Sequence, residues 1–353
     1  METDGEQLEM QPKENKKRTG IQERYNAAKN LRTSLQQGPL VSVTPPQHKA
    51  YSTVPSQAVD SVFGDEENVY RQRQMALAAG CETYAASGGR GDTKMPPGQH
   101  VIVDDKHRLL YCVVPRAGST SWLRLLIALR SDAVGTTSAT NVHDTHGFRT
   151  FTSFEPRRRQ QLLRDYTKLL VARDPYERVL SAYFWFVKPA SEFNGPFAQL
   201  YPPFQRSVAK RYGRGDVTLR SDGGANVTFA AFVRYVTDPR TRRADPLSLL
   251  SDGSMNPHWM PITDRCHPCT VRYNVIAHHE TLMADTEYTL RRMNASGLFE
   301  FPTARDGPST RSQLAHYYSQ LNEEEVARLR RLYEQDFKLF QYNDIIPMSG
   351  GHL

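Results

Sequence analysis

The chain has 353 residues and a formal net charge of +7 at pH 7, and 34 of its 45 basic residues are Arg. That length accommodates one large α/β domain or two smaller ones. The sequence contains no run of 18 consecutive apolar residues, which is the pattern that would indicate a membrane-spanning helix. The planar Arg fork matches sulfate, phosphate and carboxylate groups bidentately, so this composition favours an anionic ligand or substrate. A nucleic-acid partner is disfavoured, because the sequence lacks zinc-finger spacings, aromatic RNA-binding motifs and basic heptads.

Composition divides the chain into three parts. Residues 1–60 are poor in apolar side chains and rich in Gln, Ser, Thr, Lys and Pro, which predicts a disordered stem. Residues 61–104 combine a segment of helical composition with the flexible sequence SGGRGD, which predicts a helical lead-in and a linker. In residues 105–345, short apolar runs alternate with segments of helical period. This alternation predicts one α/β domain around a mostly parallel sheet.

The first strand, loop and helix of this domain begin at residue 109. Residues 109–115 (LLYCVVP) form an apolar run of strand length, and an amphipathic helix follows from Trp122. The loop between them consists of Arg116, Ala117, Gly118, Ser119, Thr120 and Ser121. Small and hydroxyl residues let backbone N–H groups converge on an anion, so the loop predicts a phosphate cradle. It lacks the ending of a Walker A sequence, which argues against an ordinary kinase, and a plain βα turn is the alternative.

A second unit of the same kind begins at residue 168. Residues 168–172 (KLLVA) predict a strand, and Asp174 and Pro175 predict the N-cap and first position of a helix. Arg173 stands at the carboxyl end of the strand, where open α/β sheets bind ligands. Arg178 and Ser181 lie away from the main apolar stripe of the helix. We interpret the unit as a second anion site, with surface salt bridges as the alternative.

Longer stretches around both units resemble one protein family. RAGSTSWLR at residues 116–124 is similar to the 5′-phosphosulfate-binding motif of Golgi carbohydrate sulfotransferases of the chondroitin and dermatan 4-O type. VARDPYERVLSAY at residues 171–183 is similar to their 3′-phosphate-binding motif. HWMP at 258–261, CHPC at 266–269, YNVI at 273–276, ETL at 280–282 with Asp285, and YEQDFKLF at 333–340 follow that family's order and spacing.

The resemblance implies a sulfotransferase fold, with helices flanking a central, mostly parallel sheet and a kinase-like, P-loop-type nucleotide cradle. It implies an enzyme that uses 3′-phosphoadenosine 5′-phosphosulfate (PAPS) as sulfuryl donor. The implied acceptor is a glycosaminoglycan or related glycan, specifically the 4-OH of N-acetylgalactosamine in chondroitin or dermatan. The implied donor-binding residues are Arg116, Ala117, Gly118, Ser119, Thr120, Ser121, Arg173, Arg178 and Ser181.

Catalysis by such an enzyme requires a group that deprotonates the acceptor hydroxyl and a cation at the leaving phosphate. Arg116 is the expected cation. His143 and His146 are the expected bases, because they lie between the two motifs, where related polysaccharide sulfotransferases place a histidine. His258 is a competing base. No metal is expected, since a sulfuryl group carries less charge than a phosphoryl group.

Three residues depart from the family pattern. Position 116 is Arg where the family usually has Lys, and an Arg fork is not equivalent to a compact ammonium group. Ser121 stands where Asn is usual, and Leu123 stands where a basic residue is usual. A catalytically impaired sulfotransferase-like protein that binds glycans is therefore the alternative function.

Acceptor recognition is expected at basic segments and at the later motifs. Basic residues cluster at residues 157–159, 210–214 and 240–243, and we expect one of these clusters to contact an acidic glycan. The predicted substrate-binding residues are His258, Trp259, Arg240 and Arg242.

Four cysteines, Cys81, Cys112, Cys266 and Cys269, allow two disulfides of any connectivity in an oxidising lumen, or four thiols in the cytosol. Alternatively, Cys266 and Cys269 are half of a zinc site completed by nearby histidines.

The resemblance also implies a compartment. The family is anchored in the Golgi membrane with a lumenal catalytic domain, and that location is expected here although the sequence shows no anchor or signal peptide. Two glycosylation sequons, at Asn226 and Asn294, fit a glycoprotein.

Overall fold

The computed structural model describes residues 56–86, 98–131, 147–193, 197–243, 245, 255–296 and 309–346. Up to residue 55, the predicted stem lies outside the described residues, as does the predicted SGGRGD linker segment. The domain boundaries at residues 60, 104 and 345 stay predictions.

A five-stranded sheet of order β3-β1-β2-β4-β5 forms the centre of the fold. Its strands are β1 (Val101–Asp104), β2 (Leu109–Cys112), β3 (Arg149–Thr150), β4 (Thr167–Ala172) and β5 (Val275–His278). β2 pairs with β4, and β4 with β5, in parallel, whereas β1 is antiparallel to both of its neighbours. The four residues between β1 and β2 are too few for the crossover that parallel pairing needs.

The strands form where both faces of the sheet are covered. Every residue of β1 and β2 is buried, as are the last four residues of β4. Strands buried on both faces are continuously apolar rather than alternating, which matches the runs LLYC and LLVA. The predicted strands at residues 109–115 and 168–172 are confirmed as β2 and β4.

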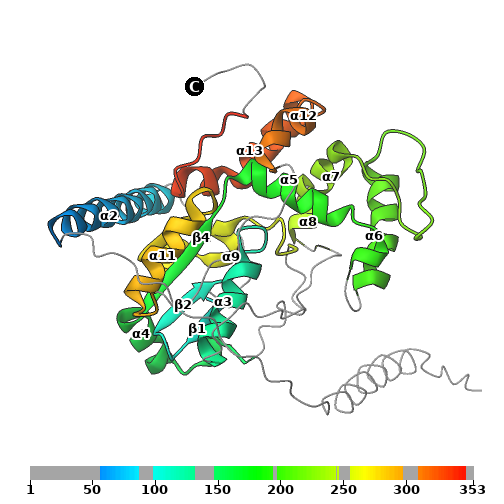
Figure 1. The fold of residues 1–353 in the computed structure, drawn as a ribbon. Coiled ribbons are helices and arrows are strands. Elements are labelled where there is room, and N and C mark those ends of the chain that lie inside the picture. Colours follow the sequence, from blue (N-terminus) through cyan, green and yellow to red (C-terminus); the bar gives the residue numbers. More distant parts are fainter. Residues whose placement is uncertain are drawn as a thin grey trace, which may run out of the picture. The chain divides into compact units, whose positions relative to one another are not determined.

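Helices surround the sheet and extend beyond one end of it. The α-helices are α2 (Ser56–Ala86), α3 (Ser119–Ser131), α4 (Pro156–Asp165), α5 (Pro175–Phe186), α6 (Phe197–Tyr212), α7 (Phe229–Thr237), α8 (Pro239–Arg243), α9 (Ile262–Cys266), α10 (Pro268–Val271), α11 (Leu282–Arg292), α12 (Leu314–Tyr318) and α13 (Glu323–Leu339). Short 3-10 turns are η1 (Phe151–Ser153), η2 (Ala190–Glu192), η3 (His279–Thr281) and η4 (Arg311–Gln313). Figure 1 shows α5 continuing from the carboxyl end of β4, with α6, α7, α8, α12 and α13 gathered beyond that end.

Local signals explain where these helices begin. The predicted N-cap Asp174 is confirmed, because its carboxylate accepts from the backbone N–H of Tyr176 at 2.8 Å and of Glu177 at 3.0 Å. Asn322 and Glu325 form a capping box at the start of α13. α3 begins at Ser119, three residues before its apolar stripe, so the hydroxyl residues of the predicted loop form the first helical turn.

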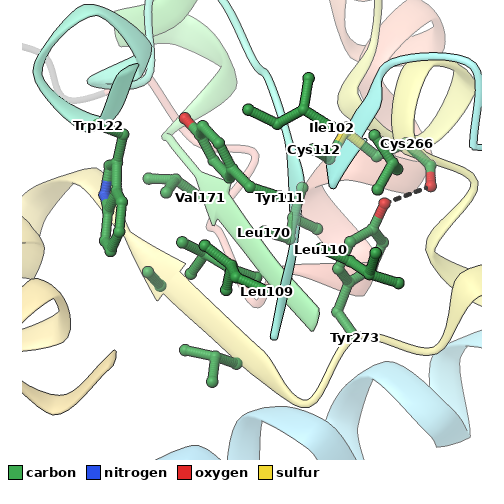
Figure 2. Packing of buried hydrophobic residues seen from close by; sticks show 14 of the residues in the cluster. Ile102, Leu109, Leu110, Tyr111, Cys112, Trp122, Leu170, Val171, Cys266 and Tyr273 are labelled. Carbon is green, nitrogen blue, oxygen red and sulfur yellow. Dashed lines mark hydrogen bonds between the residues drawn. A yellow bond between two sulfur atoms is a disulfide. The ribbon is translucent and has the colours of Figure 1, made fainter. Parts of the chain in front are cut away.

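Two apolar clusters hold the layers together. The first surrounds the sheet and includes Tyr111, Trp122 and Tyr273, which Figure 2 shows packed around β2 and β4. The second fills the space between α5, α6, α7 and α13 and contains Trp259. β4 belongs to the first cluster and α5 belongs to the second. The carboxyl end of β4 therefore lies where the chain passes from one cluster to the other.

Two disulfides join segments far apart in the sequence. Cys112 at the end of β2 is bonded to Cys266, and Cys81 of α2 is bonded to Cys269. Figure 2 shows the first of these beside the Tyr273 hydroxyl, which donates to the backbone carbonyl of Cys266 at 2.9 Å. The zinc half-site hypothesis is wrong, because both of its sulfurs are bonded to other cysteines.

Candidate active site

The loop after β2 has an unusual backbone. Arg116 has φ +67° and Gly118 has φ +79°, so two of three successive residues are left-handed. The positive φ favours glycine at position 118, and an added Cβ would lie 2.7 Å from Cδ2 of Leu282, so that side chain would have to shift. Trp122 N–H donates to the Gly118 carbonyl, which leaves the N–H groups of the first turn of α3 without intrahelical partners. Such a helix start attracts anions.

The predicted second anion site lies directly beside this loop. The Arg116 guanidinium donates to the Ser181 hydroxyl from Nε at 3.0 Å and from Nη2 at 2.8 Å. Arg173 Nη1 donates to the backbone carbonyl of Arg116 at 2.8 Å. The two βα turns, which are 65 residues apart in the sequence, are therefore in direct contact through both side chain and backbone.

Arg173 is positioned to meet a charged group. It is 6% exposed and pairs with Glu177 at 3.2 Å. Its Nε is buried and has no hydrogen-bond partner among the described residues. A buried donor without a partner is costly, so an anion that accepts from Arg173 would remove that cost.

Arg178 plays a different part from its neighbours. It is 1% exposed, and its three nitrogens donate to the backbone carbonyls of Pro115, Pro257 and Met260 at 3.2, 3.0 and 2.7 Å. The predicted direct contact between Arg178 and a donor stays a prediction, and in this structure the guanidinium is enclosed by protein. Arg178 instead ties the loop after β2 to the segment that precedes α9.

A third βα turn, after β5, completes the arrangement, and the sequence analysis gave it no role. Glu280 Oε1 accepts from the backbone N–H of Asp174 at 3.1 Å, and Leu282 packs on Gly118. The pKa of Asp174 is raised to about 6 by burial and by the charges of Glu177 and Glu280. The signal available in the sequence was the strand-like YNVIAH followed by ETL, at a third parallel strand.

Two histidines in this turn are held neutral. Burial lowers the pKa of His278 to about 4, with Arg73 contributing in the same direction. Burial and the charge of Arg173 likewise lower the pKa of His279 to about 4. The charge of Arg116 also acts on His279, which places a neutral imidazole near both anion-binding turns.

The remaining predicted residues have varied surroundings. Trp259, a predicted glycan contact, is 0% exposed, and its indole N–H donates to Asp245 at 3.0 Å. His258 is half-buried and stacks on Trp185 with ring centroids 3.7 Å apart. Arg242 pairs with Asp264 at 3.3 Å. His143 and His146, the predicted bases, lie outside the described residues.

Arg240 lies at the edge of an open, basic hollow of about 560 Å³. We call this the α8 hollow, and it is lined by Tyr212, Arg234, Asp238, Pro239, Arg240, Arg243 and Arg328. Arg234 forms an ion pair with Glu325, with 2.7 Å between Nε and Oε1. Arg240 and Arg243 are exposed, and within the described residues neither guanidinium forms an ion pair or hydrogen bond.

Replacement of Gly118 by Ala tests the backbone geometry of the turn between β2 and α3. We expect Gly118→Ala to lower the free energy of unfolding by about 1–3 kcal/mol, because of its positive φ and its contact with Leu282. Chemical denaturation measures this change. Gly215→Ala is the control, since nothing lies within 4 Å of its added Cβ and its stability should be unchanged. Equal stability of the two variants would show that the first turn is not constrained in this way.

The neutral histidines predict a pH dependence of stability. Their folded pKa values of about 4 lie below the ordinary histidine value of 6.5, so the unfolded chain binds more protons in this interval and stability is lost as pH falls from 6.5 towards 4. At pH 5 we expect His279 to account for about 1–2 kcal/mol of that loss. Thermal unfolding at pH 7 and pH 5 should show a smaller loss in His279→Gln. The exposed His316→Gln should retain the wild-type loss, and an undiminished loss in His279→Gln would refute the assignment.

Comparisons with known proteins show which family the chain belongs to. The sequence model of the sulfotransferase family matches residues 99–343 of this chain. Carbohydrate sulfotransferase 10 of Xenopus laevis is 33% identical over 250 residues, covering 69% of this chain and 67% of that protein. Carbohydrate sulfotransferase 11 of Rattus norvegicus is 30% identical over 259 residues, with the same coverage. Carbohydrate sulfotransferase 8 of Mus musculus is 28% identical over 292 residues, covering 81% and 66%.

No solved structure matches the chain. None of the described helices is long and apolar enough to cross a membrane. The family match spans the turns after β2, β4 and β5. The protein therefore belongs to the sulfotransferase family and is a carbohydrate sulfotransferase, an enzyme that transfers a sulfuryl group to a glycan.

Proposed function

We propose that this protein transfers the sulfuryl group of PAPS to a hydroxyl of a glycosaminoglycan, with the 4-OH of N-acetylgalactosamine in chondroitin or dermatan as acceptor. The contact between Arg116 and Ser181 is the observation that carries the proposal. It brings together two turns that each suit an anion, and PAPS carries a 5′-phosphosulfate and a 3′-phosphate on one nucleotide. The motif resemblance at residues 116–124 and 171–183 supports the acceptor class.

In this proposal the two turns divide the donor between them. Arg116, with the backbone N–H groups of Gly118, Ser119 and Thr120, binds the 5′-phosphosulfate, while Ala117 and Ser121 complete the turn around it. Arg173 and Ser181 bind the 3′-phosphate. The buried, unpartnered Nε of Arg173 supports this role, because an anion would supply its missing acceptor. We assign Arg178 to the framework rather than to the donor.

The proposed reaction is an in-line transfer. The acceptor oxygen forms a bond to sulfur while the bond between sulfur and the 5′-phosphate oxygen breaks, and the hydroxyl proton passes to a base. Arg116 stabilises the charge that develops on the leaving phosphate. We retain His143 or His146 as the proposed base, with His258 as the competitor. We expect no metal requirement, because the transferred group carries little charge.

The α8 hollow is the proposed acceptor surface. Arg240 and Arg243 are exposed at the hollow, where Asp238 lies near Arg240, and Tyr212 adds an aromatic side chain to the lining. Carboxylates or sulfates of an acidic glycan match such guanidinium forks. Arg242 contributes indirectly, since its ion pair with Asp264 ties α8 to α9. We therefore centre acceptor binding on Arg240 and Arg243, with His258 as a further contact.

The Golgi lumen is the proposed location. Two disulfides join the described cysteines, and disulfides persist in oxidising compartments of the secretory pathway. Both sequon asparagines, Asn226 and Asn294, are exposed, as glycosylation requires. Nascent polysaccharide is available in the same compartment.

Donor binding is tested by removing one hydroxyl. We expect Ser181→Ala to weaken binding of 3′-phosphoadenosine 5′-phosphate (PAP) by roughly 10- to 100-fold, because a hydrogen bond to a charged group is lost. Isothermal titration calorimetry measures the affinity. Ser207→Ala, at an exposed position of α6, should bind PAP like the wild type. Unchanged affinity in Ser181→Ala would contradict the proposed 3′-phosphate site.

Acceptor binding is tested with labelled PAPS and desulfated chondroitin, dermatan and heparan, followed by disaccharide analysis. We expect sulfate at the 4-OH of N-acetylgalactosamine. Arg240→Ser/Arg243→Ser should raise the KM for the preferred polymer about 5- to 10-fold and flatten its salt dependence, with kcat unchanged. Arg157→Ser/Arg159→Ser on α4 removes the same charge from a rival cluster and should have no such effect. Equal effects of the two double variants would contradict a specific acceptor surface.

A further inference from the structure

A buried carboxylate stands behind the third turn of the candidate site. Asp285 of α11 is 2% exposed. Its Oδ1 accepts from the Tyr70 hydroxyl at 2.5 Å, and its Oδ2 accepts from Arg73 Nη1 at 2.9 Å. Oδ2 also accepts from the backbone N–H of His278 and from the Thr281 hydroxyl, each at 2.7 Å. Four donors thus satisfy one buried charge.

Two of these donors belong to α2, more than 200 residues earlier in the chain. α2 lies along β5 and α11, where Tyr70 stacks on Tyr288 with ring centroids 3.6 Å apart. Gln74 donates to the backbone carbonyl of Asn274 at 2.7 Å, and Arg73 also donates to that of Ile276 at 2.9 Å. Together with the disulfide from Cys81, these contacts fix α2 against the third parallel strand.

The other two donors belong to the turn that touches both donor-binding turns. Residues 278–282 lie between Asp285 and the candidate site. On the site side, Leu282 packs on Gly118 and Glu280 accepts from the backbone N–H of Asp174. On the far side, His278 and Thr281 bind Asp285. A displacement of residues 278–282 would therefore change the contacts of both proposed anion-binding turns.

We propose that Asp285 is a positioning residue which, with Tyr70 and Arg73 of α2, holds residues 278–282 against the two donor-binding turns. α2 is then a part of the donor site, although none of its residues contacts the donor. This inference rests on the proposed function, because it assigns the held turns to PAPS. It concerns the geometry of donor binding and leaves the α8 hollow unaffected.

The physical basis is the cost of an unsatisfied buried charge. Removal of the donors on α2 leaves Asp285 with only the His278 N–H and the Thr281 hydroxyl, so the carboxylate attracts water and α11 loosens. The turn at residues 278–282 then loses its support, and Leu282 no longer restrains the left-handed Gly118. Donor affinity should fall, whereas the acceptor surface on α8 keeps its structure.

The test compares Tyr70→Phe/Arg73→Met with Arg71→Met in the full chain. Arg71 is exposed on the same helix and donates to the Asn68 side chain at 2.9 Å, so Arg71→Met is a matched control. Hydrogen exchange of the peptide containing residues 115–122 is measured without ligand, and PAP affinity is measured by calorimetry. KM values for PAPS and acceptor, together with kcat, complete the set. Arg73→Lys, which keeps the charge, serves as the rescue.

We expect the double variant to exchange faster at residues 115–122 and to bind PAP roughly 5- to 20-fold more weakly, with the acceptor KM unchanged. Arg73→Lys should recover part of the affinity. Unchanged exchange in this peptide overturns the inference. Unchanged PAP affinity despite faster exchange overturns it as well.

The same measurements distinguish a failure of the proposed PAPS site from a failure of the positioning role of Asp285 and α2. If the wild-type protein binds no PAP, the donor assignment falls. Faster exchange at residues 115–122 in the double variant would then still show that α2 positions the loop. If wild-type PAP binding is normal and both variants match it, the donor assignment stands and the role of Asp285 and α2 is rejected.

Discussion

The contact of Arg173 with the backbone of Arg116 is the constraint on which the candidate site depends. Arg116 has a left-handed backbone, a conformation that costs a non-glycine residue about 1–3 kcal/mol. Arg173 binds the carbonyl of that residue at 2.8 Å, and the Arg116 side chain then reaches Ser181. The conformation of the turn after β2 is thus stabilised by the turn after β4, so the two βα units are held in direct contact.

Buried charges hold the rest of the framework in the same manner. Arg178 binds three carbonyls around the first turn, and Asp285 collects four donors behind the third. Asp336 of α13 accepts from the backbone N–H groups of Ile262 and Thr263 at 2.7 and 2.8 Å. Each of these side chains joins segments that are distant in sequence, so the helices beyond β4 are tied to the loops they surround.

Sequence patterns predicted the parts of the fold that local rules determine. The strands at 109–112 and 167–172 follow from apolar runs, and Asp174 follows from capping chemistry. The burial of Arg178 and Trp259 was not predictable, because it depends on packing between α5, α13 and the segment before α9. The disulfide pairing and the third turn at 278–282 likewise depend on long-range contacts. The contact between Arg116 and Ser181 required the family resemblance, since neither local pattern determines a neighbour 65 residues away.

The central claim is that the turns at Gly118 and Ser181 bind the two ends of one nucleotide. Calorimetric titration of the wild-type protein with PAP, 5′-AMP, 3′-AMP and adenosine tests it most directly. Because each turn contributes its own charge-assisted hydrogen bonds, PAP should bind at least ~10-fold more tightly than either monophosphate, and adenosine most weakly. Equal affinity for PAP and one monophosphate would contradict the claim, because only one of the two turns would then bind the ligand.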